Sequence, residues 1–143
     1  MALADKRDCG PYDEPVRKKV RPAQKVLLLL FRFDSQILNG GVTQFIWNAP
    51  FEIDDVEKAI EKLGLVELAK DYKKVDDRLL EKMKEWIPLK QKWNEDPDWS
   101  YFQKSYALLK LEWFDKRYMD KHRSKMVRAL IEFVVKHRNE FAK

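Results

Sequence analysis

The sequence has little cysteine and little glycine. Cys9 is its single cysteine, which excludes an internal disulfide and a zinc site built from cysteines. A reducing cytoplasm is therefore the expected location. Only four glycines punctuate 143 residues. Because a meander of strands needs many turn residues, this scarcity favours helices joined by short loops.

Long hydrophobic runs are also missing. The most apolar stretch, Val26 to Phe31, is soon interrupted by Arg32 and Asp34. It falls well short of the roughly 20 residues that cross a bilayer. The first eight residues are charged where an export signal would be apolar, so no export is expected. We predict a soluble protein without a membrane partner.

Sequence motifs of catalysis are absent as well. There is no phosphate-binding loop, dinucleotide fingerprint, metalloprotease helix or nucleophile elbow. His122 and His137 are too far apart in sequence to place two ligands on adjacent helical turns, so we interpret both as structural. Most carboxylates lie beside Lys or Arg on faces expected to be solvated, where paired acid and base catalysis is disfavoured. We predict no enzyme activity, no cofactor and no metal site.

The sequence does contain material for a core and an uneven distribution of charge. Hydrophobic residues make up 45% and charged residues 37%, which excludes disorder of the whole chain. Residues 1–22 contain six basic and four acidic residues, and residues 23–98 contain twelve basic and fifteen acidic residues. Residues 99–143 contain eleven basic and five acidic residues. We predict a basic, proline-containing arm over residues 1–22 and a single helical domain over residues 23–143.

Apolar spacing predicts helices along most of the chain. The first, Ala23 to Leu38, is apolar around most of its circumference and is expected at the centre of a bundle. A buried strand over Val26 to Phe31 is the alternative. Asn39-Gly40-Gly41 ends the helix, because glycine adopts the left-handed conformation without a side-chain penalty. Val42 to Asn48 fits a short second helix before Ala49-Pro50 breaks it.

Capping signals predict the boundaries that follow. Asp54 is expected to cap the next helix, which Gly64 ends in a Schellman motif with Leu65. Asp76 is expected to cap a further helix that stops or kinks at Pro88.

The C-terminal third is divided in the same way. Residues 88–99 are predicted to be a loop, and Ser100 with Gln103 has the spacing of a capping box that opens another helix. A break is expected around Phe114 to Tyr118, after which Asp120 opens the last helix. The predicted fold is all-α, a single irregular bundle of six or seven helices.

Two charged surfaces are candidates for binding a partner. On the acidic one, carboxylates four residues apart repeat about every 6 Å along a helix, which is of the order of phosphate spacing on one DNA strand. An ordinary solvated helix face is the alternative, because basic residues surround them. The acidic candidates are Asp77, Glu81 and Glu85.

The basic candidate combines the arm with the last helix, provided that this helix begins early enough. Without a glycine-rich loop or a recognised DNA-reading module, its binding to nucleic acid would be electrostatic, and a solvated face is again the alternative. The basic candidates are Arg17, Lys18, Lys19, Arg21, Arg117, Lys121, Lys125 and Arg128.

The segment from Asn39 to Asn48 resembles the signature of a small bacterial all-helical family named after a DNA-mimic protein. The pattern is Asn-Gly-Gly, two residues, Gln, an aromatic residue, two residues, then Asn. The matching residues are Asn39, Gly40, Gly41, Gln44, Phe45 and Asn48. We interpret them as architectural, since glycines and amides build turns. The resemblance extends through Phe114 to Tyr118 and the final helix, and covers roughly Leu27 to Phe141.

This resemblance implies a compact all-α fold, no known catalytic activity and a protein partner. For the namesake, it implies an acidic dimer that occupies the DNA-binding surface of a transcription regulator, so a homodimer is also an expectation here. The present chain differs in being basic, with a pI of about 9.2. We therefore predict a non-enzymatic protein-interaction module that binds a nucleic-acid-binding or regulatory protein. Direct electrostatic binding of nucleic acid through the arm and the C-terminal helix is the alternative.

Overall fold

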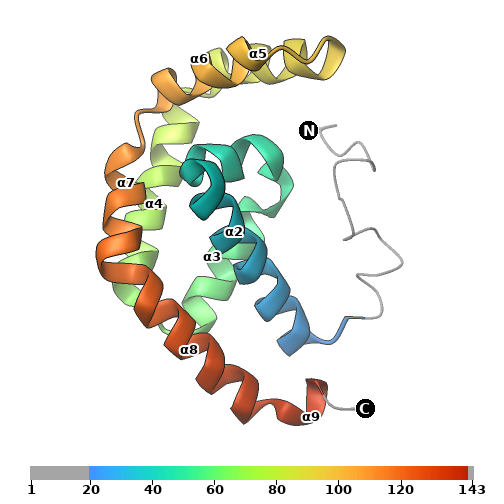
Figure 1. The fold of residues 1–143 in the computed structure, drawn as a ribbon, viewed down its shortest axis with the longest axis vertical. Helices are drawn as coiled ribbons and strands as arrows, with labels where there is room; N and C mark the ends of the chain where they lie inside the picture. Colours follow the sequence, from blue (N-terminus) through green and yellow to red (C-terminus); the bar gives the residue numbers. More distant parts are fainter. Residues whose placement is uncertain (1–19, 142–143) are drawn as a thin grey trace.

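The computed structural model describes residues 20–141, and over these residues it contains helices and no strand (Figure 1). The predicted all-α fold is confirmed. Two short helical turns, η2 (Pro50–Glu52) and η3 (Tyr118–His122), join α2 to α3 and α7 to α8. The α-helices are α2 (Pro22–Asn48), α3 (Ile53–Lys62), α4 (Val66–Glu81), α5 (Met83–Glu95), α6 (Trp99–Leu109), α7 (Glu112–Arg117), α8 (Arg123–Lys136) and α9 (Arg138–Phe141).

Helix α2 lies in the middle of the helical bundle, as predicted. It packs against α3, α6, α7, α8 and α9, while α5 and α6 lie side by side across one end of the molecule (Figure 1). Phe33 of α2 is fully buried, and its ring meets the edges of Phe45, Tyr72 and Tyr118. The helix is not covered on all sides, however, because Phe31 is 65% exposed.

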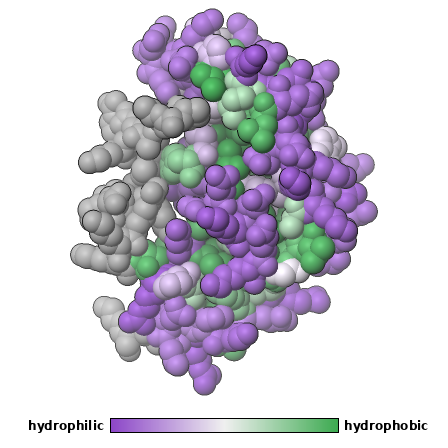
Figure 2. All heavy atoms as spheres, turned by 180° about the vertical axis from the view of Figure 1, so that it is seen from behind, coloured by the Kyte–Doolittle hydropathy of each residue, from purple (hydrophilic) through white to green (hydrophobic). Residues whose placement is uncertain are grey.

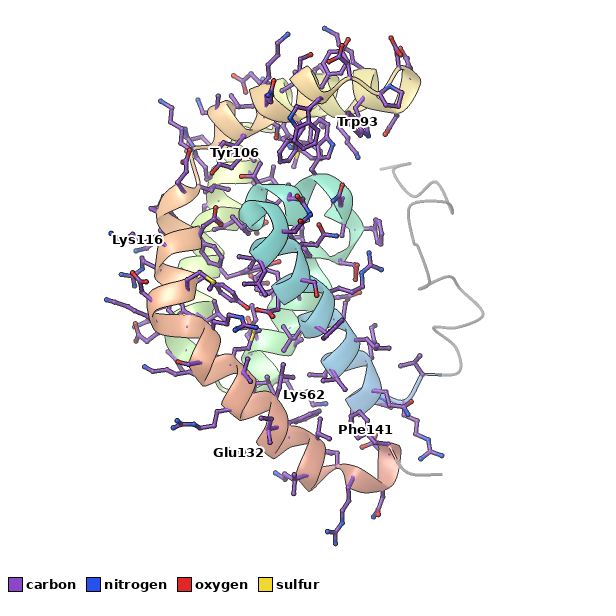
Figure 3. All side chains as sticks on the ribbon, viewed as in Figure 1. Lys62, Trp93, Tyr106, Lys116, Glu132 and Phe141 are labelled. Carbon is purple, nitrogen blue, oxygen red and sulfur yellow. The ribbon has the colours of Figure 1, made fainter. Side chains whose placement is uncertain are left out.

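The last helix returns to the start of α2. Phe141 of α9 lies beside the first turns of α2 (Figure 3). The backbone N–H of Ala23 donates to a carboxylate oxygen of Glu140 at 3.2 Å, which satisfies one of the donors left free at a helix N-terminus. Arg21 donates to the backbone oxygen of Asn139 at 3.0 Å. Residues 20–22 of the predicted arm are therefore part of the described structure, and its residues 1–19 lie outside the described range.

The predicted turn at the two central glycines is confirmed. Gly41 has φ +82°, and the two halves of α2 change direction there. The backbone N–H of Val42, the first residue after the turn, donates to Oδ1 of Asp115 on α7 at 2.8 Å. A side chain at Gly41 would collide with this carboxylate. Glycine is therefore needed both for the backbone conformation and for the close approach of α7.

The second glycine prediction also holds. Gly64 has φ +70° and ends α3. The backbone N–H of Leu65 reaches the oxygen of Ile60 at 3.3 Å, and that of Gly64 reaches Glu61 at 2.9 Å. These two bonds form the predicted Schellman motif.

The predicted N-caps are wrong. Asp54 lies inside the first turn of α3, and Asp76 lies within α4. Asp98 rather than Ser100 caps α6, since its Oδ1 accepts the backbone N–H of Ser100 at 2.9 Å. Acidic residues are favourable both at the cap and in the first turn, where the helix dipole attracts them, so composition alone does not fix the register.

Two predicted interruptions are also displaced. Helix α5 runs through Pro88 to Glu95, so the predicted loop over residues 88–99 is largely helical. Lys84 and Pro88 are both exposed, and water can satisfy the carbonyl that proline leaves without a donor.

The chain leaves helical geometry at Lys110, and the predicted break around Phe114 to Tyr118 is found only as the end of α7 at Arg117, where η3 begins. Lys110 has φ +52° and ends α6 in the left-handed conformation that usually calls for glycine. From Glu112 the chain stays helical through η3 into α8, so Asp120 does not open a helix.

We predict that Gly41→Ala lowers the free energy of unfolding by about 2–3 kcal/mol, through backbone strain and the displaced Asp115 bond. Gly64→Ala is the matched control, because Gly64 also has positive φ but a side chain there meets nothing within 4 Å. It should lose only about 1 kcal/mol. Urea denaturation of both variants measures the difference. Equal losses would show that the contact with Asp115 contributes nothing.

Candidate functional site

Two carboxylates hold the η3 segment against the rest of the molecule. The first is Asp71 of α4, which is buried. Its Oδ2 accepts Nε of Arg117 at 2.7 Å and Nε2 of His122 at 2.6 Å. Burial acts to raise the pKa of Asp71, but the hydrogen bonds and charges of Arg117 and His122 outweigh it and hold the pKa below its ordinary value. Asp71 therefore stays ionised and joins α4 to both ends of η3.

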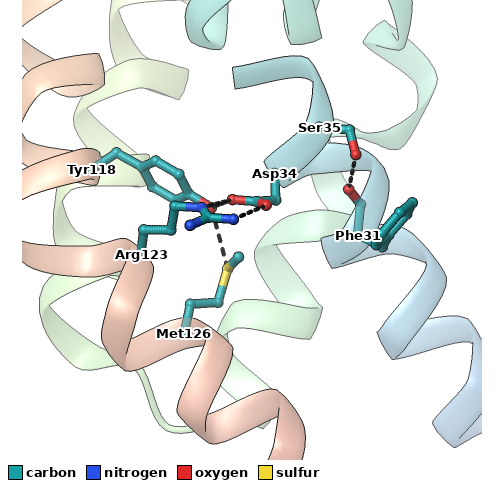
Figure 4. A network of polar contacts seen from close by, with 6 residues as sticks. All are labelled: Phe31, Asp34, Ser35, Tyr118, Arg123 and Met126. Carbon is teal, nitrogen blue, oxygen red and sulfur yellow. Dashed lines mark hydrogen bonds and ion pairs between the residues drawn. The ribbon is translucent and has the colours of Figure 1, made fainter. Parts of the chain in front are cut away.

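The second carboxylate is Asp34 of α2 (Figure 4). Its Oδ1 accepts the hydroxyl of Tyr118 at 2.5 Å and Nε of Arg123 at 2.9 Å, and its Oδ2 accepts Nη2 of Arg123 at 3.1 Å. Burial, followed by the bond to Asp34, raises the pKa of Tyr118 well above its ordinary value, so its hydroxyl keeps its proton and donates. This pair of contacts joins α2 to η3 and α8.

The buried polar side chains around η3 thus bind one another. His122, one of the two histidines interpreted as structural, is engaged with Asp71, and Nδ1 of His137 lies 3.0 Å from the backbone oxygen of Phe133. Within residues 20–141, no three His, Cys, Asp or Glu side chains are grouped so that they could hold a metal ion. The same residues include no helix long and apolar enough to span a bilayer.

The signature amides also bind within the chain. Gln44 and Asn48, from the second half of α2, both donate to Oε1 of Gln36 in the first half, at 2.8 and 3.0 Å. These bonds help to fix the angle between the two halves of α2. Phe45 is buried, and Asn39 is exposed.

A different arrangement is found where α3 packs against α4. Carboxylates from both helices gather there, and we call this group the acidic cluster. Helices α3 and α4 lie behind α2 in Figure 1, and the surface seen from that side is largely hydrophilic (Figure 2). The acidic cluster consists of Asp54, Glu57 and Glu61 of α3 and Asp76 and Asp77 of α4.

The carboxylates of the acidic cluster repel one another. Burial raises the pKa of Glu57, and neighbouring carboxylates, first Glu61 and then Asp76, raise it further. Burial likewise raises the pKa of Asp76, with Asp54 and Asp77 adding to the effect. Both shifts mean that the folded protein disfavours the charged forms of these groups.

Cations compensate this charge only in part. Lys73 pairs with Asp77 at 3.7 Å and acts to lower the pKa of Glu57 and Asp76. Among residues 20–141, no ion pair reaches Asp54, Glu57, Glu61 or Asp76. The acidic cluster is therefore a set of fixed, mutually repelling carboxylates open to an outside cation.

The predicted acidic candidates do not share one helix. Asp77 belongs to the acidic cluster, and Glu81 pairs with Arg78 at 3.3 Å. Glu85 lies on α5, because Lys82 leaves helical geometry (φ −103°, ψ 9°) and separates it from α4. The sequence did carry a signal for the cluster that we missed. Its three α3 members are spaced by three and four residues, which places them on one side of a helix.

The basic candidates are divided as well. Arg117 is engaged with Asp71, so it does not extend the stripe. The helix does begin early enough, and Lys121, Lys125 and Arg128 are exposed along η3 and α8. Arg17, Lys18 and Lys19 lie outside the described residues, and Arg21 binds Asn139. Lys116 of α7 also points outward (Figure 3).

Comparison with known proteins gives one match. The family model described as DMP19-like protein matches residues 18–137. This range contains the glycine turn, Asp34, Asp71 and the acidic cluster. No curated protein and no solved structure matches the chain.

We predict that Asp76→Asn stabilises the protein at neutral pH by about 0.5 kcal/mol, because it removes an ionised group that its neighbours repel. A carboxyl with a raised pKa in the folded state reduces stability as the pH rises through that pKa. The gain should therefore vanish near pH 3, where the carboxyl is protonated in both states. Thermal melts across this pH range measure it. Glu81→Gln is the control and should give no gain, since Glu81 has a partner in Arg78. A loss of stability in Asp76→Asn at pH 7 would contradict the repulsion.

Proposed function

The chain belongs to the DMP19-like protein family, and from this membership and the acidic cluster we propose that it is a non-enzymatic module that binds another protein. The binding surface is the face of α3 and α4 that carries the acidic cluster. The partner presents a basic surface to it, and a nucleic-acid-binding protein is the partner whose chemistry fits best. Such proteins carry Lys and Arg side chains arranged to meet anionic oxygens.

The observation that supports this proposal most is that most carboxylates of the acidic cluster form no ion pair with the described part of the chain. Four of its five carboxylates have no ion pair within residues 20–141, and burial, followed by repulsion from neighbouring carboxylates, raises the pKa of Glu57 and Asp76. A basic partner would relieve that repulsion and gain charge-assisted hydrogen bonds at the same time. The carboxylates stand on two packed helices, so the backbone that carries them is already in place before a partner binds.

The proposal is narrower than mimicry of DNA by the whole molecule. The chain has a pI of about 9.2, and the exposed side chains of Lys121, Lys125 and Arg128 belong to another part of the surface. Only the face of α3 and α4 is assigned to the partner. The absence of catalytic motifs supports a binding role, and the single cysteine supports a cytoplasmic location.

The test is an affinity purification from native lysate, with and without nuclease, using a variant of the cluster. The variant is Glu57→Gln/Glu61→Gln/Asp76→Asn. We expect a protein that the parent retains after nuclease treatment and that the variant loses by about tenfold or more, since several charge-assisted contacts are removed together.

A control variant carries the same change of charge elsewhere. Glu67, Glu81 and Glu85 are exposed carboxylates outside the cluster, and their replacement by Gln should leave the partner bound. Partners that disappear with nuclease, or that both variants lose equally, would contradict the assignment of this surface.

A second candidate function is direct binding of nucleic acid, because Lys121, Lys125 and Arg128 are exposed along η3 and α8. We expect only weak binding of a short duplex near physiological salt, since three cations neutralise few phosphates. Titration at several salt concentrations measures this. Tight, salt-sensitive binding that is lost when all three residues are replaced by Gln would favour this second function over the first.

A further inference from the structure

A long apolar groove lies between α2 and α8, away from the acidic cluster. It has a volume of about 400 Å³ and is lined almost entirely by aliphatic and aromatic side chains. Three of these are unusually open to solvent: Phe31 is 65% exposed, and Ile131 and Val135 are each 61% exposed. Singly exposed apolar residues need no explanation, but a continuous apolar groove marks a surface that another molecule covers.

The polar side chains at one end of the groove already have hydrogen-bond partners. Asp34 and Arg123 line it, and they bind each other through two hydrogen bonds while Tyr118 donates to Asp34 as well. This end therefore offers no free charge to a ligand. What enters the groove must meet it with apolar surface.

The charge along the two edges is unequal. On the α8 side, Arg128 lies three and seven residues before Ile131 and Val135 on one helical edge, and Lys121 and Lys125 continue it. One exposed carboxylate, Glu132, lies four residues after Arg128 on the same edge, so the three cations outnumber it. Of these three cations, none has an ion pair with a residue of the described part of the chain. On the α2 side, the edge is formed by uncharged residues, Gln24 and Ser35. The groove thus has an apolar floor and one basic edge.

The dimensions suit a helix. Leu27 and Phe31 on α2, and Val127 and Ile131 on α8, are each spaced by four residues, which is the repeat that receives the side chains of a third helix. Helix α8 has 14 residues and spans about 20 Å, or roughly four turns. The openness of Phe31 and Ile131 argues against an acyl chain, because small-molecule sites enclose most of their ligand.

We propose that the α2–α8 groove is a docking site for a short amphipathic helix of a partner protein, with an apolar face and acidic residues along one edge. The acidic edge lies against Lys121, Lys125 and Arg128. This site is separate from the acidic cluster, and neither proposal depends on the other.

The probe is a pair of synthetic helical peptides of about 18 residues with the same leucine face. One carries Glu along one edge, and the other carries Lys at the same positions. Binding is measured by fluorescence anisotropy with the full chain, and the contact is located by amide chemical shifts. We expect the Glu peptide to bind about tenfold more tightly than the Lys peptide and to shift resonances of α2 and α8.

Substitutions in the groove test whether the peptide binds there. Ile131→Glu and, as a second variant, Val135→Glu should each weaken binding of the Glu peptide about tenfold or more, because each places a charge of the same sign as the peptide's on the α8 side of the groove. Both residues are largely exposed, and circular dichroism melts verify that the variants fold. Leu80→Glu is the matched control. Leu80 is 62% exposed on α4, outside the groove, so its replacement should change nothing.

Three results would overturn the proposal. Neither peptide binds, both bind equally, or Leu80→Glu weakens binding as much as Ile131→Glu. A fourth is found by sedimentation of the chain alone: a dimer that Ile131→Glu dissociates would assign the groove to a second copy of the chain. None of these results bears on the cluster variants, so failure here is distinguishable from failure of the proposed function.

Discussion

The hydrogen bond from the backbone N–H of Val42 to Asp115 fixes the direction in which the second half of α2 leaves the turn at Gly41. It crosses the place where Gly41 lets α7 approach the backbone of α2, and it gives the second half of α2 an anion at its N-terminus. The direction set there carries Trp47 into the core, where its ring meets Trp86, Trp93 and Phe102 at 5.8–5.9 Å. The α5–α6 pair is thereby anchored to α2, although its residues lie far from Gly41 in sequence.

The carboxylates of the protein fall into two classes with different consequences. Asp34 and Asp71 are bound by cations and donors from η3 and its neighbours, and they hold α2, α4 and α8 in place. Glu57 and Asp76, by contrast, sit among other carboxylates that raise their pKa. The first class stabilises the fold. The second opposes folding at neutral pH, and a surface that does so is the better candidate for binding a partner.

The sequence predicts those features that depend on a single residue or on one helix. The conformations of Gly41 and Gly64 follow from the chemistry of glycine, and helical periodicity predicts the all-α fold. The caps of α3 and α6 are misplaced because several acidic residues near each start are equally suitable, whereas Asp76 caps nothing because α4 continues through it to Glu81. The break at Lys110 is missed because no glycine stands there. The spacing of the three α3 carboxylates indicates only that they share one side of a helix. The whole acidic cluster forms when α3 packs on α4, and that packing cannot be read from the spacing of either helix. The groove is missed for the same reason, since its two walls come from opposite ends of the chain.

We propose that the partner protein binds at the acidic cluster. Carboxyl labelling with carbodiimide and glycine ethyl ester, read out by mass spectrometry, tests it most directly, because the reagent modifies exposed carboxylates of the folded protein. The labelling is compared between the free chain and its complex with the purified partner. We expect Glu57, Glu61 and Asp76 to be protected in the complex, while Glu81 and Glu85 are labelled as before. Unchanged labelling of the cluster in a saturated complex would contradict it.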